Sequence, residues 1–455
     1  MIFSSILFLM YFLPLVLGVY YIVPKRFKNF VLLIFSLVFY AWGEPLYIGL
    51  MAFSIIFNYI CGLLVKGRKG VLVLTVVGNL AGLFFFKYTD FFIDTVNGAF
   101  GTNMQLLNLA LPVGISFYTF QAMSYVIDVY RGNAKSQKNI ISFGTYIALF
   151  PQLIAGPIVR YNTIDEQLSN RKVTAEGLAK GIVVFVVGLG KKVLIANNIG
   201  MLWDTMSSSG RLSVASAWLG IFAFALQIYF DFSGYSDMAI GLGRMFGFEF
   251  EKNFNYPYVS TSITDFWRRW HISLSTWFKE YVYIPLGGNR VSPIRKRFNL
   301  LVVWLLTGFW HGAGFNFILW GLYYAIILIL EKDVYGKYLS KFPRFIKTIY
   351  SLFLVLIGWV FFASPTVSDA FLYIGAMFGR GTQGFLDKEA LYALSSYGII
   401  FIIGFVAMLP FGKKLFAPVW KKHPIIFLVP CIAVFALCVA YLADASYNPF
   451  LYFRF

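Results

Sequence analysis

The stretch Asn299-Leu-Leu-Val-Val-Trp-Leu-Leu-Thr-Gly-Phe-Trp-His311-Gly-Ala-Gly-Phe-Asn-Phe-Ile-Leu-Trp-Gly-Leu-Tyr-Tyr-Ala-Ile-Ile-Leu-Ile-Leu330 contains no charged side chain and a single histidine. A helix that crosses a membrane needs about 20 apolar residues, so this run is too long for one simple crossing. Gly308, Gly312 and Gly314 surround His311 and leave the backbone open to a break. We therefore expect an interrupted membrane segment. Its histidine is a functional candidate because an ionisable group is expensive to bury in a membrane.

The composition of the whole chain supports this interpretation. Of its 455 residues, 59% are hydrophobic and 13% are charged, whereas soluble domains average about 25% charged residues. The apolar runs lack the period-two alternation of a membrane β-barrel. The sequence predicts an all-α, polytopic helical bundle of the cytoplasmic membrane, with about 11 or 12 crossing or half-crossing helices and re-entrant segments. No linker or repeat divides it, so we expect a single domain over residues 1–455.

Turn residues and basic loops predict how the chain is threaded. Residues 30–65 are interrupted at Trp42-Gly-Glu-Pro45, which predicts two short helices joined by an outside turn. The segment 150–160 contains two prolines and a glycine, so we expect a broken segment that lines a cavity. Basic loops, including the one at residues 413–422, are expected inside, and residues 364–394 outside.

Several other functional classes lack their sequence marks. The net charge of +18 comes from short loops beside apolar segments, which indicates contact with lipid headgroups and no nucleic-acid partner. Cys61, Cys431 and Cys438 lie in apolar stretches without Cys-x-x-Cys spacing, and the histidines are poorly spaced for zinc. Phosphate loops, nucleophile elbows and His-Glu-x-x-His motifs are missing from the sequence. We expect no metal and no bound cofactor.

A second histidine lies in a tryptophan-rich run, Ser262-Ile-Thr-Asp-Phe-Trp-Arg-Arg-Trp-His271-Ile-Ser-Leu-Ser-Thr-Trp-Phe-Lys-Glu280. Read as one helix, the run has an apolar face and a charged face. Ser262 and Asp265 form a capping-box pattern, and Arg269 is one turn from Asp265. His271 falls at the edge of the apolar face, so we expect it where lipid or core meets water.

These motifs resemble a known family. Arg268-Arg-Trp-His271-Ile-Ser-Leu-Ser275 and Gly308-Phe-Trp-His311-Gly-Ala313 are similar to the two signature histidine motifs of the membrane-bound O-acyltransferase (MBOAT) family. Tyr283-Ile-Pro-Leu-Gly-Gly-Asn-Arg290 resembles its bacterial alginate O-acetyltransferase branch, which is related to the teichoic acid D-alanyl transferases. The resemblance covers nearly the whole chain.

The resemblance implies the MBOAT fold and a specific activity. An acyl group, acetyl in this branch, would pass from a cytosolic thioester across the membrane to hydroxyls of an extracytoplasmic polysaccharide. Members of the branch work with a separate extracytoplasmic acetyltransferase partner of the SGNH type, so that partner is a second possible recipient.

The chemistry of acyl transfer selects the candidate catalytic residues. Transfer to a hydroxyl needs a base and a group that stabilises the oxyanion, and neutral histidine suits the base. His311 is the candidate general base; the alternative is a core histidine bonded to a backbone carbonyl. By resemblance, His271 positions donor or acceptor or stabilises charge; the alternative is a merely interfacial histidine.

Five further residues are candidate substrate contacts, each with an alternative explanation. Tryptophans also serve as packing or interface-belt residues, and Asp231 also suits an ion pair with Arg244. The basic cluster after Gly288 suits a solvated inside loop, or the phosphates of a coenzyme A thioester, which makes acetyl-CoA the expected donor. The five candidates are Trp267, Trp310, Asn316, Asp231 and Arg290.

A rival function comes from another class. A polytopic transporter or flippase for a lipid-linked sugar shares the helix count, the broken segments and the buried charges. Such a transporter needs no acyl donor, so consumption of acyl-CoA that depends on His311 discriminates between the two hypotheses.

Overall fold

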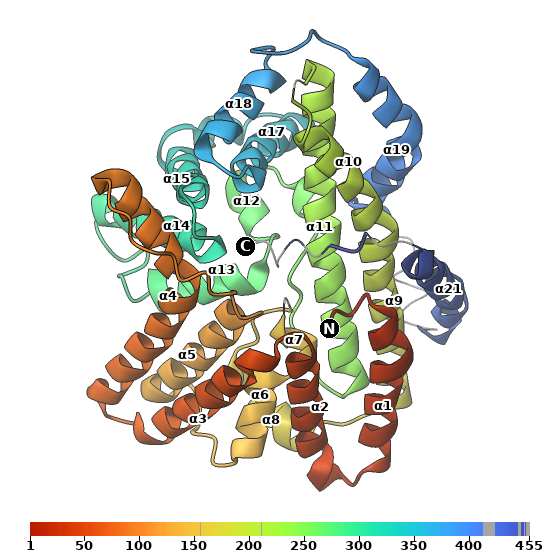
Figure 1. Cartoon of the computed structure of the whole chain (residues 1–455). Coiled ribbons are helices and arrows are strands. Elements are labelled where there is room, and N and C mark those ends of the chain that lie inside the picture. Colours follow the sequence, from red (N-terminus) through yellow and green to blue (C-terminus); the bar gives the residue numbers. More distant parts are fainter. Residues whose placement is uncertain (155, 211, 413–423, 445–446, 450, 452–455) are drawn as a thin grey trace. The chain divides into compact units, whose positions relative to one another are not determined.

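The computed structural model describes the chain except residues 155, 211, 413–423, 445–446, 450 and 452–455. Over the described residues the secondary structure is helical and no strand occurs (Figure 1). The predicted all-α class is confirmed. The expected inside loop at residues 413–422 lies almost wholly outside the described part.

Two compact units can be distinguished. The first comprises residues 1–187, 235–251 and 428–432, and the second comprises residues 188–234, 252–427 and 433–455. Three helices contribute residues to both units: α9 (Ala175–Gly190), α11 (Val214–Met245) and α21 (Leu428–Asp444). The expectation of a single domain stays a prediction.

The first unit is built on aromatic packing. Phe3, Phe8, Phe39 and Phe150 are fully or almost fully buried, and their rings contact one another. Its remaining helices are α1 (Leu13–Ile22), α2 (Lys28–Gly43), α3 (Ile48–Leu64), α4 (Lys69–Phe100), α5 (Ile115–Arg131), α6 (Ile140–Ala148), α7 (Phe150–Leu153) and α8 (Tyr161–Asn170). The break between α2 and α3 and the very short α7 agree with the predicted interruptions at residues 42–45 and 150–160.

The second unit holds both histidine motifs. Its other helices are α10 (Asn197–Ser207), α12 (Ile263–Trp267), α13 (Ile272–Phe278), α14 (Pro293–His311), α15 (Phe315–Leu330), α16 (Gly336–Leu339), α17 (Arg344–Ala363), α18 (Val367–Met377) and α19 (Lys388–Ala407). Trp320, Tyr324 and Trp359 lie at the centre of its apolar core. The core therefore packs directly behind the histidine-bearing helices.

The described helices account for a multi-pass membrane protein. Three apolar helices are shorter, with 10–17 residues: Phe8–Ile22, Val367–Met377 and Leu428–Asp444. Six are long and apolar enough to cross a membrane: Lys25–Gly43, Pro45–Leu64, Lys69–Phe100, Val214–Met245, Arg344–Ala363 and Lys388–Ala407.

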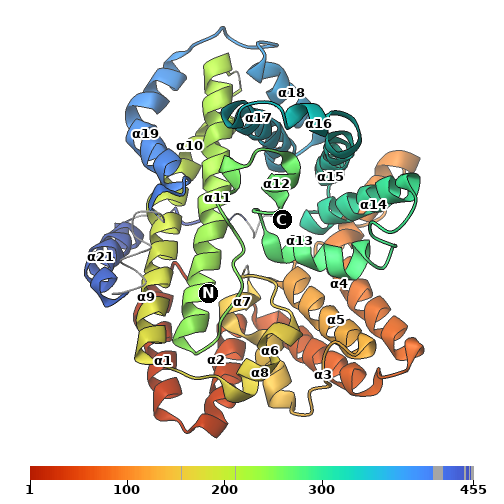
Figure 2. The same cartoon turned by 180° about the vertical axis from the view of Figure 1, so that it is seen from behind.

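The run Asn299–Leu330 breaks where its glycines predicted. Helix α14 ends at His311 and α15 begins at Phe315, and the two helices lie side by side (Figures 1 and 2). A Cβ at Gly308 would lie 2.2 Å from the Phe317 carbonyl oxygen, and one at Gly321 would lie 2.4 Å from the Trp304 carbonyl oxygen. Glycine is required at Gly308 and Gly321 because the two backbones touch there.

Candidate active site

The element that carries His271 differs from the predicted single helix. His271 has a left-handed backbone, with φ of 44°, and stands between α12 and α13 as the N-cap of α13. Such a conformation is uncommon outside glycine and often marks a functional site. The expectation of one continuous helix over the tryptophan-rich run is therefore wrong.

The start of this element is capped as expected. The Ser262 hydroxyl oxygen accepts a hydrogen bond from the Asp265 backbone N–H at 3.0 Å, and the Asp265 carboxylate pairs with Arg269 at 2.8 Å. The second half of the capping-box pattern differs, because the Asp265 carboxylate accepts from the Thr261 backbone N–H and not from that of Ser262.

His271 is buried, not interfacial. Its side chain is 2% exposed, and its ring meets Phe232 edge-on with centroids 4.7 Å apart. The predicted position at a boundary with water is wrong because the backbone leaves the helical conformation at His271. The helical wheel assumed a regular backbone and could not place the ring.

Asn253 fixes the tautomer of His271. The Asn253 side-chain oxygen accepts hydrogen bonds from the Ser273 backbone N–H at 3.1 Å and from the Ser273 hydroxyl at 2.9 Å. A backbone N–H can only donate, so the Asn253 atom at this position is its oxygen. That oxygen lies 3.2 Å from His271 Nδ1, which must then carry the proton. Nε2 is left as the basic nitrogen of the neutral ring.

Burial also keeps His271 uncharged. Neither α12 nor α13 is long enough to be a membrane span, and desolvation by burial lowers the pKa of His271 to about 3. A histidine with such a pKa is neutral at pH 7. It can accept a hydrogen bond from a substrate group.

His311 is the last residue of α14, immediately before the glycine break. It is 7% exposed, and its ring meets those of Trp320 and Phe362 edge-on, both with centroids 5.1 Å apart. The Gly312 position is crowded, since a Cβ there would lie 2.1 Å from the Phe317 ring. Aromatic rings from α15 and α17 thus hold His311 in place.

The two histidines line one cavity. This histidine cavity has a volume of about 260 Å³, and its walls come from α12, α13, the π-helical segment Lys279–Tyr283, α14 and α15. Trp267, Trp304 and Thr307 also line it. The structure therefore places both motif histidines at a common space.

Buried donors lie beside this cavity. Trp267 lines it, and its indole N–H is buried without an acceptor in the part of the chain that the structure describes. The Tyr324 hydroxyl is in the same situation, and its ring centroid lies 4.8 Å from that of Trp267. Buried polar groups are normally hydrogen-bonded. The Trp267 indole N–H is therefore a candidate donor for a bound substrate oxygen, whereas Tyr324 does not line the cavity.

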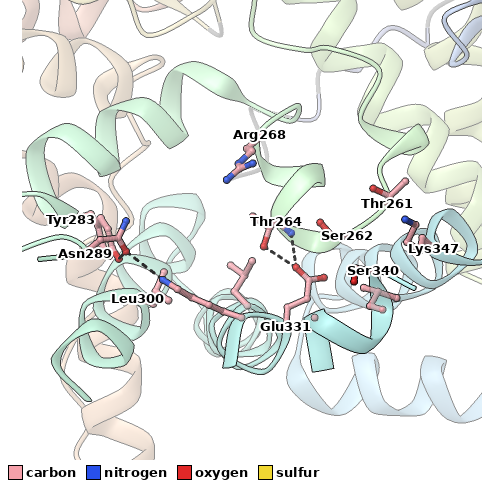
Figure 3. Close-up of a pocket in the computed structure, with 14 residues that line it drawn as sticks. Thr261, Ser262, Thr264, Arg268, Tyr283, Asn289, Leu300, Glu331, Ser340 and Lys347 are labelled. Carbon is pink, nitrogen blue, oxygen red and sulfur yellow. Dashed lines mark hydrogen bonds between the residues drawn. The ribbon is translucent and has the colours of Figure 1, made fainter. Parts of the chain in front are cut away.

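A larger, basic cavity adjoins the histidine cavity. It has a volume of about 630 Å³, and Figure 3 shows Arg268 on one side, Tyr283 and Asn289 on another, and Lys347 on a third. Lys332 also lines this basic cavity and donates to the Asn289 side-chain oxygen at 3.3 Å. The pKa of Lys332 is lowered, first by partial burial and then by nearby Lys296.

The one acidic residue in the lining of the basic cavity is already engaged by protein donors. The buried Glu331 carboxylate accepts hydrogen bonds from the Thr264 backbone N–H at 3.0 Å and from the Thr264 hydroxyl at 2.8 Å (Figure 3). It accepts a further hydrogen bond from the Ile263 backbone N–H at 2.7 Å. Arg268, Lys332 and Lys347 therefore dominate the charge that this cavity presents.

The two cavities share part of their lining. Five residues belong to both: Thr264, Arg268, Tyr283, Leu300 and Leu328. The two cavities are therefore neighbours, separated by the side chains that line both. An extended molecule with a charged head and a reactive tail fits the arrangement.

The other predicted contacts lie outside both linings. Trp310 packs between the two histidine rings, with centroids 6.1 Å from His271 and 5.1 Å from His311. The Asn316 amide donates to the Ser364 carbonyl oxygen at 2.9 Å, at the end of α17. Arg290 is exposed in the turn before α14. Their roles toward substrate stay predictions.

Asp231 forms an ion pair, but with a different partner from the one considered. Its carboxylate lies 2.7 Å from Lys192, while Arg244 pairs with Glu249 at 3.0 Å. The suggested pairing of Asp231 with Arg244 is wrong. Both residues lie on α11, but Arg244 is more than three turns further along, near the helix end.

Some site residues carried no recognisable signal in the sequence. Asn253 stands in a loop far from His271 along the chain, and Lys332 and Lys347 look like ordinary loop cations. Only the tertiary fold brings them to the cavities. Among the described residues, no group of three or more His, Cys, Asp or Glu side chains could hold a metal ion.

Comparison with known proteins adds a consistent family signal. The sequence model of the membrane-bound O-acyltransferase family matches residues 135–368. The chain is 38% identical to a protein of Azotobacter vinelandii named "Probable alginate O-acetylase AlgI", over the full length of both. It is 36% identical to the peptidoglycan O-acetyltransferase of Helicobacter pylori, over 86% of this chain and 82% of that one. A more distant relative is the teichoic acid D-alanyltransferase of Bacillus subtilis, 30% identical over 49% of this chain and 59% of that one.

Proposed function

Because the chain belongs to the membrane-bound O-acyltransferase family and is a multi-pass membrane O-acetyltransferase, we propose that it takes acetyl from a cytosolic acetyl-CoA. The acceptor is a hydroxyl of a polysaccharide outside the membrane, or of an SGNH-type partner that acetylates that polysaccharide. The observation that carries the proposal is one cavity lined by both His271 and His311, with a basic cavity beside it that shares five of its lining residues.

The basic cavity suits the donor. Coenzyme A carries phosphates on a long flexible arm that ends in the thioester. Arg268, Lys332 and Lys347 would attract the phosphates, and the arm would cross the shared wall toward the histidines. Alginate and peptidoglycan are the acceptors named for two relatives, so a hydroxyl-rich glycan is the acceptor class we propose here.

The transfer itself needs one proton acceptor and one oxyanion stabiliser. The acceptor oxygen attacks the thioester carbonyl while His311 removes its proton, and a tetrahedral oxyanion forms. The Trp267 indole N–H, a buried donor at the cavity wall, would stabilise that oxyanion. The intermediate collapses with loss of the C–S bond, and the proton on His311 passes to the leaving thiolate, which yields the acetate ester and free coenzyme A.

The decisive experiment measures coenzyme A release by the purified protein. Acetyl-CoA is supplied with an alginate or a peptidoglycan oligosaccharide, and the free thiol is titrated over time. We expect acceptor-dependent release that falls about 10²–10⁴-fold in His311→Gln, at unchanged melting temperature. Retained release in a well-folded His311→Gln protein would contradict the base assignment. If acetyl-CoA is never consumed but a lipid-linked sugar crosses vesicles, the transporter hypothesis replaces the proposal.

The donor cavity has its own test. Lys332→Gln and Lys347→Gln should each raise the KM for acetyl-CoA by about tenfold or less and leave kcat nearly unchanged, because they remove an attraction that exists before the reaction. Added salt should raise the wild-type KM for acetyl-CoA and so reduce its difference from the KM of the two variants. Lys337→Gln is the matched control, since Lys337 is an exposed lysine of α16 that lines neither cavity. An equal rise of KM in the control would contradict the site.

A further inference from the structure

The buried ion pair between Lys192 and Asp231 is not used by the mechanism above. The side chains of Lys192 and Asp231 are 2% and 3% exposed, and Lys192 Nζ lies 2.7 Å from an Asp231 carboxylate oxygen. Lys192 comes from the π-helical segment Lys191–Ala196, which follows α9, and Asp231 from the middle of α11. Such a pair is costly to bury, and a hydrophobic pair of similar volume often stabilises as well. Stability of the fold alone therefore does not explain why Lys192 and Asp231 are paired here.

The C-terminal segment of the chain supplies the missing partners. The Lys192 ammonium donates a hydrogen bond to the Pro449 carbonyl oxygen, and the Leu451 backbone N–H donates to Asp231 at 2.9 Å. The cation thus holds a backbone acceptor, and the anion holds a backbone donor two residues further on. These two hydrogen bonds depend on the direction in which the segment runs, because the cation needs a carbonyl oxygen and the anion needs an N–H group.

Side chains of the same C-terminal segment also bind to α10. The Tyr447 hydroxyl donates to the Asp204 carboxylate at 2.6 Å, and the Asn197 amide donates to the Asn448 side-chain oxygen at 3.2 Å. The Leu451 side chain is buried. The C-terminal segment is therefore held by side-chain and backbone contacts to α10, to the π-helical segment and to α11.

Phe232, the residue next to Asp231, connects this ion pair to the active site. Phe232 meets the His271 ring edge-on at 4.7 Å. The π-helical segment and α11 are in direct contact, since a Cβ at Gly234 would lie 3.1 Å from the Lys192 backbone nitrogen. The helix segment that carries Asp231 has little freedom to shift without moving Phe232.

We propose that Lys192 and Asp231 form a binding socket for the chain's own C-terminal segment, residues 447–449 and Leu451, and that the docked segment positions Phe232 against His271. Lys192 and Asp231 are then positioning residues that act on the reaction through the histidine. The π-helical geometry at Lys191–Ala196 agrees with this role, because such segments often occur at functional sites.

A charge swap separates this socket from a pair that only stabilises the fold. In Lys192→Asp combined with Asp231→Lys, the attraction between α11 and its neighbour is kept, but donor and acceptor are exchanged. The Pro449 carbonyl oxygen would then face a carboxylate and the Leu451 N–H an ammonium. A purely structural pair is restored by the swap, whereas the socket is not.

Docking is measured by crosslinking, independently of acetyl transfer. Cysteines replace Asn197 and Asn448 in a background without the native cysteines, and a short thiol crosslinker is applied to the full-length protein in membranes. We expect efficient crosslinking with the native pair, and at least about tenfold less with the swap or with Lys192→Met. Native crosslinking in both variants would overturn the socket.

Kinetics test the link to His271. In the swap variant we expect kcat for acetyl transfer to fall by about 10²-fold, with the KM for acetyl-CoA and the melting temperature close to wild type. Deletion of residues 447–455 should give the same drop in kcat. If the swap lowers crosslinking but leaves kcat at the wild-type value, the proposed positioning of Phe232 is wrong. If the swap restores both crosslinking and kcat, the whole inference fails.

Discussion

The rings of His271 and Trp310 meet edge-on, with centroids 6.1 Å apart and an interplanar angle of 68°. Trp310 directly precedes His311, so one tryptophan joins two motifs that are well separated along the chain. A shift of α14 relative to α13 would therefore move both histidines relative to the cavity they line. The site therefore depends on the stability of the α14–α15 hairpin and on the protonation of His271.

The first prediction concerns Gly308, where the two helices of the hairpin touch. In Gly308→Ala the new methyl group would lie 2.2 Å from the Phe317 carbonyl oxygen, so the backbones must separate. We expect the free energy of unfolding to fall by about 1–3 kcal/mol, measured by thermal unfolding in detergent. Gly398→Ala in α19 is the matched control, because no atom lies within 4 Å of its Cβ position. There the substitution should be neutral or should stabilise by about 0.5–1 kcal/mol.

The second prediction is an acid-sensitive stability that originates in His271. Its folded-state pKa of about 3 lies below the unfolded value of about 6.5, so between these values the unfolded chain binds a proton that the folded chain does not. Stability should therefore be complete above about pH 6.5 and fall by about 1.4 kcal/mol for each pH unit below it. His271→Gln should remove this slope. Identical pH dependence of unfolding in wild type and His271→Gln would contradict the assignment.

The sequence predicted much of this arrangement for clear physical reasons. The uncharged run Asn299–Leu330 with its central glycines predicted both the membrane setting and the break at His311, since both follow from composition and local backbone freedom. The left-handed turn at His271 could not be predicted, because the local pattern favours a continuous helix and only tertiary contacts overrule it. Asn253, Lys192 and Lys332 were missed for a related reason: their partners are distant in sequence.

The third prediction concerns Asn253, which fixes the tautomer of His271. Asn253→Ala removes the acceptor 3.2 Å from His271 Nδ1 and leaves the ring free to turn or to change tautomer. We expect kcat to fall by about tenfold or more while the KM for acetyl-CoA stays constant. Asn253→Asp keeps an acceptor and adds a negative charge, which raises the pKa of His271. Its activity should recover at high pH and be lost as the pH falls, with an acid limb shifted upward from wild type.

Two results would contradict the role of Asn253 in fixing the tautomer of His271. If Asn253→Ala and Asn253→Asp lose kcat equally at every pH, the side chain serves the loop and not the histidine. A pH profile of Asn253→Asp that coincides with wild type would show that His271 does not titrate during turnover.

The last prediction is topological and decides from which side the donor enters. The basic cavity is lined by Lys332 and by Lys347 near the start of α17, a candidate span that ends at Ala363. Residues 364–394 follow the other end of that span.

Because cationic loops stay on the cytoplasmic side, single cysteines at Arg295 and Lys332 should react with a membrane-impermeant thiol reagent only from inside, and one at Thr382 only from outside. Lys69 and Lys135 should be inside as well, while the expected inside position of Lys414 lies beyond the described residues. Replacement of the buried Cys61, Cys431 and Cys438 supplies the background. Reaction of the Arg295 cysteine from the outer face would place the basic cavity away from cytosolic acetyl-CoA, and the donor route proposed here would be wrong even if His311 proved essential.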